Sequence, residues 1–307
     1  MRLKLVPKNT SWEFFARSKL WIGISIVLVV LSLLSFFIQS LNFGIDFRGG
    51  TSIRTESSEP IDVADYRSAL SSLDLGDITI SEVFDPNFAD DQNVAMIRIQ
   101  AQPGQEAATS TLVENSLQKL REVSEDIKFV SVESVGPKVS GELIKTAIIA
   151  VILAISAVLF YIWIRFEWQF AVGAISALIH DVILTIGIFS ALQIKFDLAI
   201  IAAILTIVGY SLNDTVVVFD RVRENLRKFK KRSLAEVMNL SINETMSRTV
   251  MTSVTTLLAL ISLFILGGDV IRGFVFAMIW GVVVGTYSSI FIASAILLWT
   301  GVKRDWS

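Results

Sequence analysis

Six long apolar stretches determine what this chain can fold into. They run from Leu20 to Ile38, Leu143 to Ile164, Trp168 to Leu192, Leu198 to Phe219, Thr249 to Leu266 and Phe274 to Trp299. Each suits a helix that crosses the hydrocarbon core of a bilayer, which takes roughly 17 to 25 residues. In lipid the backbone must satisfy its own hydrogen bonds, and a membrane barrel shows short alternating strands instead. The sequence therefore predicts an α-helical polytopic membrane protein with six transmembrane helices.

Composition excludes several other classes of protein. Hydrophobic residues make up 53% of the 307 residues, which is too apolar for a soluble domain with a charged surface. The formal net charge of -2 gives no reason to expect a polyanion, so we expect no nucleic acid partner. Cysteine is absent, which excludes disulfides and thiolate metal sites. Because Gln39 and Asn42 follow the first apolar run in place of a small-residue cleavage site, we expect a retained anchor.

Lysine and arginine residues predict the orientation of the helices. One set of connecting segments holds almost all of them: Arg2, Lys4, Lys8, Arg17, Lys19, Arg165, eight residues between Arg221 and Arg248, Lys303 and Arg304. The short loops on the opposite side hold only Lys195 and Arg272. Because cytoplasmic segments carry the excess of positive charge, we expect the termini (1–19 and 303–307) and a basic loop at 220–247 to be cytoplasmic.

The basic loop combines the run RKFKKRS with the helix-like segment SLAEVMNLSINETM. We expect this segment to lie along the cytoplasmic membrane face, against anionic lipid. The alternative, a positive-inside anchor with no other role, stays open.

Residues 42–142 differ in composition from the rest of the chain. They include 18 acidic and 8 basic residues, a net charge of -10. Apolar residues at alternate positions predict strands, and helical spacing predicts two helices. The expected strands are Thr51–Thr55, Ile78–Phe84, Val94–Gln100 and Phe129–Val135, and the expected helices contain Val63 to Leu73 and Leu112 to Val123. The order βαββαβ predicts a periplasmic α+β domain with a ferredoxin-like fold between the first helix (20–41) and a five-helix region (143–302), with Ser140 as a helix cap.

Ionisable residues inside membrane helices are the candidate functional residues, because each costs roughly 2.5 to 3.5 kcal/mol at the helix centre. Asp214 lies in the fourth helix, with Asn213 and Thr215 beside it; Arg248 opens the fifth helix from the same side and precedes Thr252. A carboxylate beside an arginine stays ionised, whereas an isolated one in low dielectric takes up a proton, so relative motion of the two helices would load or release a proton. The alternatives are a structural hydrogen bond at Asp214 and a snorkelling flank at Arg248.

His180 and Asp181 form the third candidate, about 18 Å into the third helix and so near the middle of the membrane. A proton relay is one interpretation, because imidazole titrates near neutral pH. A satisfied buried pair is the other, and it is favoured. One histidine and one aspartate do not make a usual metal site, so we expect no metal and no cofactor.

Motifs of common hydrolases are absent from the sequence: it has no HExxH, no Walker A loop and no GxSxG. We therefore expect a transport protein driven by an ion gradient and not an enzyme. A unit charge that crosses about 100 mV supplies about 2.3 kcal/mol without ATP.

Five motifs, in this order, resemble signatures of SecF, the smaller partner of SecD in bacterial protein export, a family similar to the resistance-nodulation-division transporters. They are GIDFRGG at 44–50, GPKVSGE at 136–142, RFEWQFA at 165–171, SLNDTVVVFDRVREN at 211–225 and SRTVMTSVTTLLAL at 247–260. The likeness runs along nearly the whole chain, and it departs from the expected residues at Arg48 and Gln169.

The resemblance implies a multi-pass subunit of the bacterial cell inner membrane that works with a SecD-like subunit and the SecYEG channel. Such a subunit uses the proton-motive force to draw unfolded preproteins outward. Asp214 and Arg248 take the positions of the family's intramembrane residues associated with proton use. Half of a resistance-nodulation-division exporter of small molecules or lipids is the alternative, and a structural scaffold for the channel is a third interpretation.

Overall fold

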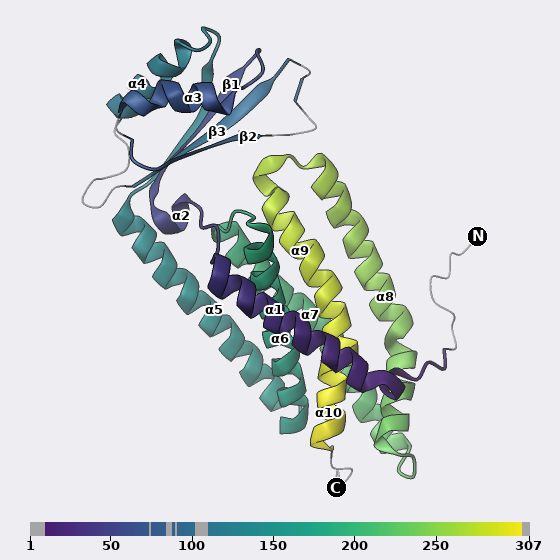
Figure 1. Cartoon of the computed structure of the whole chain (residues 1–307). Helices are drawn as coiled ribbons and strands as arrows, with labels where there is room; N and C mark the ends of the chain where they lie inside the picture. The colour runs from purple at the N-terminus through teal and green to yellow at the C-terminus, as the bar shows by residue number, and fades with distance from the viewer. Residues whose placement is uncertain (1–9, 74, 84–87, 90, 102–109, 303–307) are drawn as a thin grey trace.

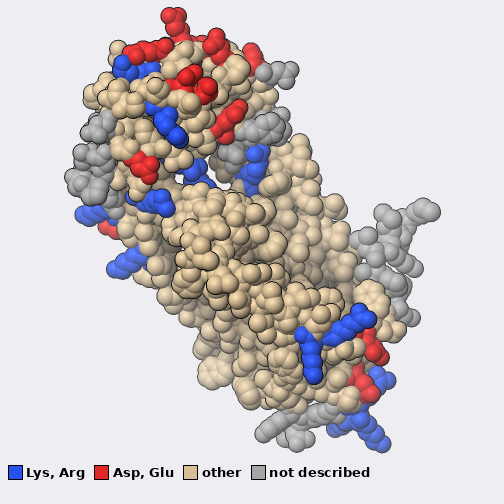
Figure 2. Space-filling model, in the orientation of Figure 1, with Lys and Arg blue, Asp and Glu red and all other residues tan. Residues whose placement is uncertain are grey.

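The chain forms a bundle of long helices that carries a small α+β domain at one end (Figure 1). The computed structural model describes residues 10–73, 75–83, 88–89, 91–101 and 110–302. Figure 2 shows a broad surface without charge over the helices, with charged side chains gathered on the small domain and at the opposite end of the bundle. An uncharged belt of this kind is what the hydrocarbon core of a bilayer requires.

Six helices of the described chain are long and apolar enough to cross a membrane, so the predicted fold class is confirmed. They are α1 (Ser18–Gln39), α5 (Pro137–Arg165), α6 (Trp168–Leu192), α7 (Leu198–Lys228), α8 (Leu234–Leu266) and a last span made of α9 (Asp269–Ser288), the π-helical turn η3 (Ser289–Ala293) and α10 (Ser294–Thr300). The 3₁₀ turn η1 (Phe14–Arg17) precedes α1, and the short helix α2 (Ile45–Arg48) follows it.

The helices α6, α7 and α9 form the interior of the bundle. Buried residues make up 56% of the most apolar part of α6 and 67% of that of the last span, against 6% for α1 and 11% for α5. Gly281 allows α9 to pass close to α7, because a Cβ atom there would collide with the side chain of Ile207. The helices α1 and α5 therefore lie at the periphery, with most of their surface left for lipid or another chain.

The helix α5 begins earlier than the sequence-based prediction at Leu143. Its N-cap is Gly136, and Pro137 lies in its first turn, where a fixed φ and a missing N–H suit a helix start. The prediction that Ser140 caps this helix is wrong. The Ser140 hydroxyl instead donates to the carbonyl oxygen of Asp46 at 2.7 Å, which ties α5 to α2.

The segment 220–247, expected as a basic loop, is mostly helical. The helix α7 extends into it, and α8 starts at Leu234 and runs without a break through Arg248. The Ser233 hydroxyl accepts from the Glu236 N–H at 3.2 Å, and the Glu236 carboxylate accepts from the Ser233 N–H at 3.0 Å. This capping box starts α8 well before its apolar run. The helix-like part of this segment is therefore the first part of α8 and continues directly into the fifth span.

The small domain has the predicted βαββαβ order. Its elements are β1 (Gly50–Ser57), α3 (Val63–Leu70) with the turn η2 (Ser71–Leu73), β2 (Ile78–Val83), β3 (Asn93–Gln100), α4 (Ser110–Arg121) and β4 (Lys128–Val135). The strands form one antiparallel sheet in the order β2-β3-β1-β4, which confirms the ferredoxin-like prediction. Phe84, assigned to the second strand from the sequence, lies outside the described residues.

Both helices of this domain cover the same face of the sheet, and the core lies between the two layers. Ile53, Leu70, Ile97 and Leu120 are fully buried there. The other face of the sheet, which carries Arg54, is turned toward the helical bundle (Figure 1). With the loops of the bundle it lines a cleft of about 580 Å³.

The linker between α1 and β1 is hydrogen-bonded to the turn between α6 and α7. The Gly44 N–H donates to the Phe196 carbonyl at 2.8 Å, and the Phe196 N–H donates to the Asn42 carbonyl at 2.8 Å. The Asp46 carboxylate accepts from the Leu198 N–H at 3.1 Å, at the first turn of α7. The base of the folded domain is therefore attached directly to α7.

Paired glycines begin the sheet. Gly49 and Gly50 have φ angles of 70° and 125°, which side chains rarely allow. A Cβ atom at Gly50 would also collide with the carbonyl oxygen of Ile99 on β3. This is the physical reason for the GG pair at the point where the chain enters the folded domain.

The carboxylate of Asp126 joins the end of β1 to the residues that precede β4. It accepts from the hydroxyl groups of Ser124 at 2.6 Å and Ser57 at 3.1 Å, and from the hydroxyl and N–H of Ser58. The donors on Ser124 and Ser58 hold the pKa of Asp126 below its ordinary value. The stability that comes from this depressed pKa is fully present above the ordinary carboxyl pKa of about 3.9 and is lost as pH falls through the folded-state value.

We predict that Asp126→Asn speeds amide hydrogen exchange in β1 and β4 at pH 7, because the amide accepts fewer of these hydrogen bonds. Below about pH 4 the difference from wild type shrinks, because the Asp126 carboxyl takes up a proton in the unfolded state at a higher pH than it does in the folded state. Exchange measured by mass spectrometry on the full chain in detergent checks this. Glu125→Gln, an exposed neighbour, is the control and leaves exchange unchanged. Equal exchange rates in the two variants at pH 7 would contradict the prediction.

Candidate functional site

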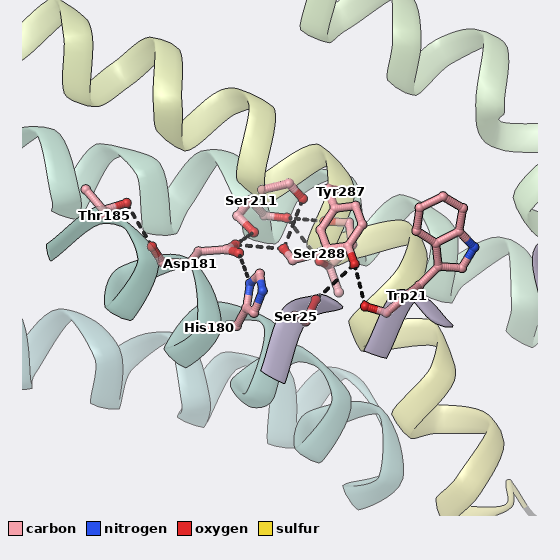
Figure 3. A network of polar contacts seen from close by, with 11 residues as sticks. Trp21, Ser25, His180, Asp181, Thr185, Ser211, Tyr287 and Ser288 are labelled. Carbon is pink, nitrogen blue, oxygen red and sulfur yellow. Dashed lines mark hydrogen bonds and ion pairs between the residues drawn. The ribbon is translucent and has the colours of Figure 1, made fainter. Parts of the chain in front are cut away.

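A network of polar side chains crosses the interior of the bundle around Asp181 of α6 (Figure 3). The Asp181 side chain is only 1% exposed. Its Oδ2 atom accepts from the Ser211 hydroxyl of α7 at 2.6 Å and from the Ser288 hydroxyl of α9 at 2.8 Å. Its Oδ1 atom lies 3.0 Å from Nδ1 of His180. The predicted His–Asp pair is thus present, and Asp181 connects three helices.

The network continues to the π-helical turn η3. The hydroxyl groups of Thr215 and Ser289 lie 2.8 Å apart, and the Ser289 hydroxyl donates to the Ser211 carbonyl at 3.2 Å. Single π-helical turns inside longer helices frequently occur at functional sites. Ser288, the last residue of α9, bonds to Asp181 of α6, and Ser289, the first residue of the turn, bonds to α7. Two successive serines therefore join the last span to both of these helices.

His180 links this network toward α1. Its Nε2 atom is buried and has no hydrogen-bond partner among the described residues. Its ring lies 6.1 Å from the ring of Tyr287, centroid to centroid. The Tyr287 hydroxyl donates its one hydrogen to the Trp21 carbonyl at 2.8 Å. It therefore accepts from the Ser25 hydroxyl, which lies 2.9 Å away. Figure 3 shows these groups on adjoining helices.

Asp214 lies one helical turn beyond Ser211 on α7 and is 3% exposed. Its Oδ2 atom is buried without a hydrogen-bond partner in the described part of the chain. Buried polar atoms are almost always hydrogen-bonded, and an unpaired carboxyl oxygen inside a membrane is a costly exception. The two buried carboxyl groups of the bundle therefore differ: that of Asp181 has three neighbours to bond with, whereas that of Asp214 has an unsatisfied oxygen.

Arg248 of α8 is exposed and lines a groove of about 960 Å³ at the end of the bundle away from the folded domain. The charged residues of this groove are Arg165, Asp220, Arg221, Arg223, Glu224, Arg227, Lys228, Glu244 and Arg248. Asp214 and Arg248 form no direct ion pair in the described structure. Charged side chains of both signs therefore surround Arg248 in this groove.

The other residues selected from the sequence separate into two groups. Thr215 belongs to the Asp181 network, whereas Thr252 is half-buried and donates to the Thr249 carbonyl of its own helix at 2.9 Å. Asn213 is exposed on the outer side of α7. Sequence reasoning missed Ser288 and Ser289, although adjacent serines in an otherwise apolar span were the available signal.

No group of three or more His, Asp or Glu side chains in the described residues is arranged to hold a metal ion. The chemistry of the site is that of hydrogen bonds and of two buried carboxyl groups.

Comparisons with known proteins identify relatives along the whole chain. Residues 115–303 match the family described as protein export membrane protein SecD/SecF, C-terminal, and residues 34–61 match the SecD/SecF GG motif. The protein translocase subunit SecF of Cereibacter sphaeroides is 58% identical over 303 residues, which cover 99% of this chain and 94% of that protein. The protein of the same name from Vibrio alginolyticus is 41% identical over 293 residues, 95% of this chain and 90% of the relative.

Solved structures give the same result. The crystal structure of SecDF from Thermus thermophilus, described as a translocon-associated membrane protein, matches with a TM-score of 0.84 at 33% identity. A structure of SecDF in a super-membrane-facing form matches with a TM-score of 0.71 at the same identity. Both matches cover 98% of this chain but only 40% of the SecDF chain, so this chain spans well under half of those proteins.

We predict that Asp181→Ala lowers the free energy of unfolding by about 1 to 3 kcal/mol, because the buried hydroxyl groups of Ser211 and Ser288 lose their acceptor. Asp181→Asn keeps one acceptor oxygen and loses less. Unfolding in mixed detergent micelles measures both. The matched control is Thr206→Ala on the exposed side of α7, whose hydroxyl bonds only to the Ala202 carbonyl of its own helix. If Asp181→Ala costs no more than this control, the network does not stabilise the bundle.

Proposed function

Because this chain belongs to the SecF family of protein translocase subunits, we propose that it uses the proton-motive force to promote export of unfolded preproteins. In this proposal it is an accessory subunit that acts with a SecD-like partner and the SecYEG channel. Its role is transport, without chemistry on a bound cofactor.

The observation that carries the proposal is the unsatisfied, buried oxygen of Asp214. A carboxyl group in this position changes its preferred protonation state when the distance to a positive charge changes. Arg248 is the nearby candidate for that charge, and its groove supplies water from the basic end of the bundle. Asp214 and Arg248 are therefore the proposed proton-coupling pair. Thr215 is a polar neighbour that ties α7 to the last span through Ser289.

The helix α7 is the proposed link between proton binding and the folded domain. Its first turn binds Asp46 of the linker through the Leu198 N–H, and Asp214 lies roughly 24 Å farther along the same helix. A shift of α7 that follows protonation of Asp214 moves the base of the folded domain. Two states that differ in this way are sufficient for a motor, provided that the proton binds one state better than the other.

A SecD-like partner is proposed to cover the outer side of α7. Thr206, Gly209 and Asn213 lie exposed along it at helical spacing. An asparagine that faces lipid is unfavourable, and small residues allow another helix to approach closely. A partner helix on this side would satisfy Asn213 and would enclose Asp214 between two halves of the complex.

The proposed location is the bacterial cell inner membrane, with both termini in the cytoplasm and the folded domain in the periplasm. The distribution of lysine and arginine supports this orientation, because the basic groove and the run after α7 lie at the end opposite the folded domain. A preprotein leaving the channel on the periplasmic side then meets the folded domain.

We predict that Asp214→Asn abolishes the part of preprotein translocation that depends on a proton gradient. Each proton that crosses about 100 mV contributes about 2.3 kcal/mol, and the amide cannot carry it. The assay is translocation into inverted membrane vesicles with and without an imposed gradient, at matched levels of the assembled complex. Asp220→Asn is the control, because this carboxylate is half-exposed and pairs with Arg165 at 2.9 Å.

A gradient-dependent rate that is unchanged in Asp214→Asn would return this residue to a structural role. Copurification with SecYEG is the accompanying measurement. A stable complex supports a translocase subunit, whereas its absence, together with transport of a small molecule or lipid, would favour an exporter.

A further inference from the structure

A second groove, with almost entirely apolar walls, opens at the side of the bundle nearest the folded domain. It lies between α5, the α1–β1 linker and the start of α7, and its volume is about 420 Å³. Phe43 and Phe47 of the linker, Phe196 of the α6–α7 turn and Val151 of α5 form its walls. Among the described residues that line it, only Arg48 at the end of α2 is charged.

The position of this groove places it within one leaflet of the bilayer. Its lining on α5 extends from Ile144 to Ile152, about 12 Å along the helix, and begins where the apolar run of α5 begins at Leu143. Half of a hydrocarbon core of about 30 Å is nearly the same length. Ile148 and Ile152 are 55% and 58% exposed, so the groove opens sideways toward lipid.

The walls suit an acyl chain better than another helix. Helices that pack in membranes meet through small residues, and among the residues of this groove only Ala147 is small. Large apolar side chains leave a slender channel that a flexible hydrocarbon chain can fill. The three phenylalanines of the wall already pack on one another, with ring centroids 5.7 to 6.1 Å apart. These contacts hold the rings in the wall, so the rings do not move inward to fill the groove.

Arg48 supplies the complementary charge at the mouth of the groove. Its side chain is exposed, and among the described residues it forms no ion pair or hydrogen bond through its guanidinium group. It lies at the boundary between the apolar span and the folded domain, at the depth where lipid phosphate groups lie. A guanidinium group binds phosphate through paired, charge-assisted hydrogen bonds.

We propose that this groove is a binding site for an anionic phospholipid, with one acyl chain between α5 and the aromatic wall and the phosphate on Arg48. The lipid comes from the leaflet on the side of the folded domain. Its acyl chain contacts both the linker and the α6–α7 turn, which are the two segments that attach the folded domain to the bundle. The bound lipid therefore stabilises this attachment, independently of whether Asp214 carries protons.

The experiment uses the purified full chain in a neutral detergent, with equal amounts of phosphatidylglycerol and phosphatidylcholine, and native mass spectrometry to count the lipids that remain bound. The wild-type chain retains phosphatidylglycerol about tenfold better, because the positive choline group of phosphatidylcholine offsets the attraction between its phosphate and Arg48. Arg48→Gln removes this preference. Lys145→Gln is the matched control, because Lys145 is exposed on α5 but does not line the groove, and it keeps the preference.

A second variant tests the acyl chain. Val151→Phe narrows the groove and reduces retention of both lipids, while thermal unfolding reports whether the fold is intact. If Val151→Phe unfolds the chain, a photoactivatable acyl chain on phosphatidylglycerol replaces it and labels residues of the groove in the wild type. Equal retention of the two lipids, a preference that survives Arg48→Gln, or a copurified polypeptide in the groove would overturn the proposal.

Discussion

Asp181 accepts hydrogen bonds from Ser211 on α7 and Ser288 on α9, and so ties together the three helices that form the interior of the membrane region. The Asp181 carboxylate is 1% exposed, so water cannot replace a hydrogen bond that it loses. The helices can therefore rotate or slide only if all the donors of this carboxylate move together. The Thr215–Ser289 contact adds a second tie one turn along α7. These bonds set the rotation of α7, and with it the direction in which Asp214 faces.

Asp181 and Asp214 are both buried aspartates, but their different surroundings suit them to different roles. Asp181 lies among donors on three helices and is held in place. Asp214, on the next helix, has an oxygen without a partner in the described structure and lies near the charged groove of Arg248. Under the proposed function, the first group provides the fixed frame and the second changes state within it. The bond between Leu198 and Asp46 then connects that change to the folded domain.

Some features of the fold were readable in the sequence, whereas others were misread for definite reasons. Hydropathy reports which residues face lipid, so it located the six spans but placed the start of the fifth at Thr249, although α8 begins at Leu234. The capping box of Ser233 and Glu236 was the overlooked signal. The start of α5 was misplaced in the same way, because the turns of this helix before Leu143 are polar and lie outside the apolar run.

The sequence by itself determined the six membrane helices and the βαββαβ order. It also indicated the candidate functional residues His180, Asp181, Asp214 and Arg248. These are local properties: the bilayer demands long apolar helices, strands and helices have different periods, and a charge in lipid is conspicuous wherever it lies. Only the tertiary structure decided which polar groups meet. Contact between α6, α7 and α9 depends on how each helix is rotated about its axis. The π-helical turn at Ser289–Ala293 changes that rotation within one span, and no periodic pattern in the sequence predicts such a turn.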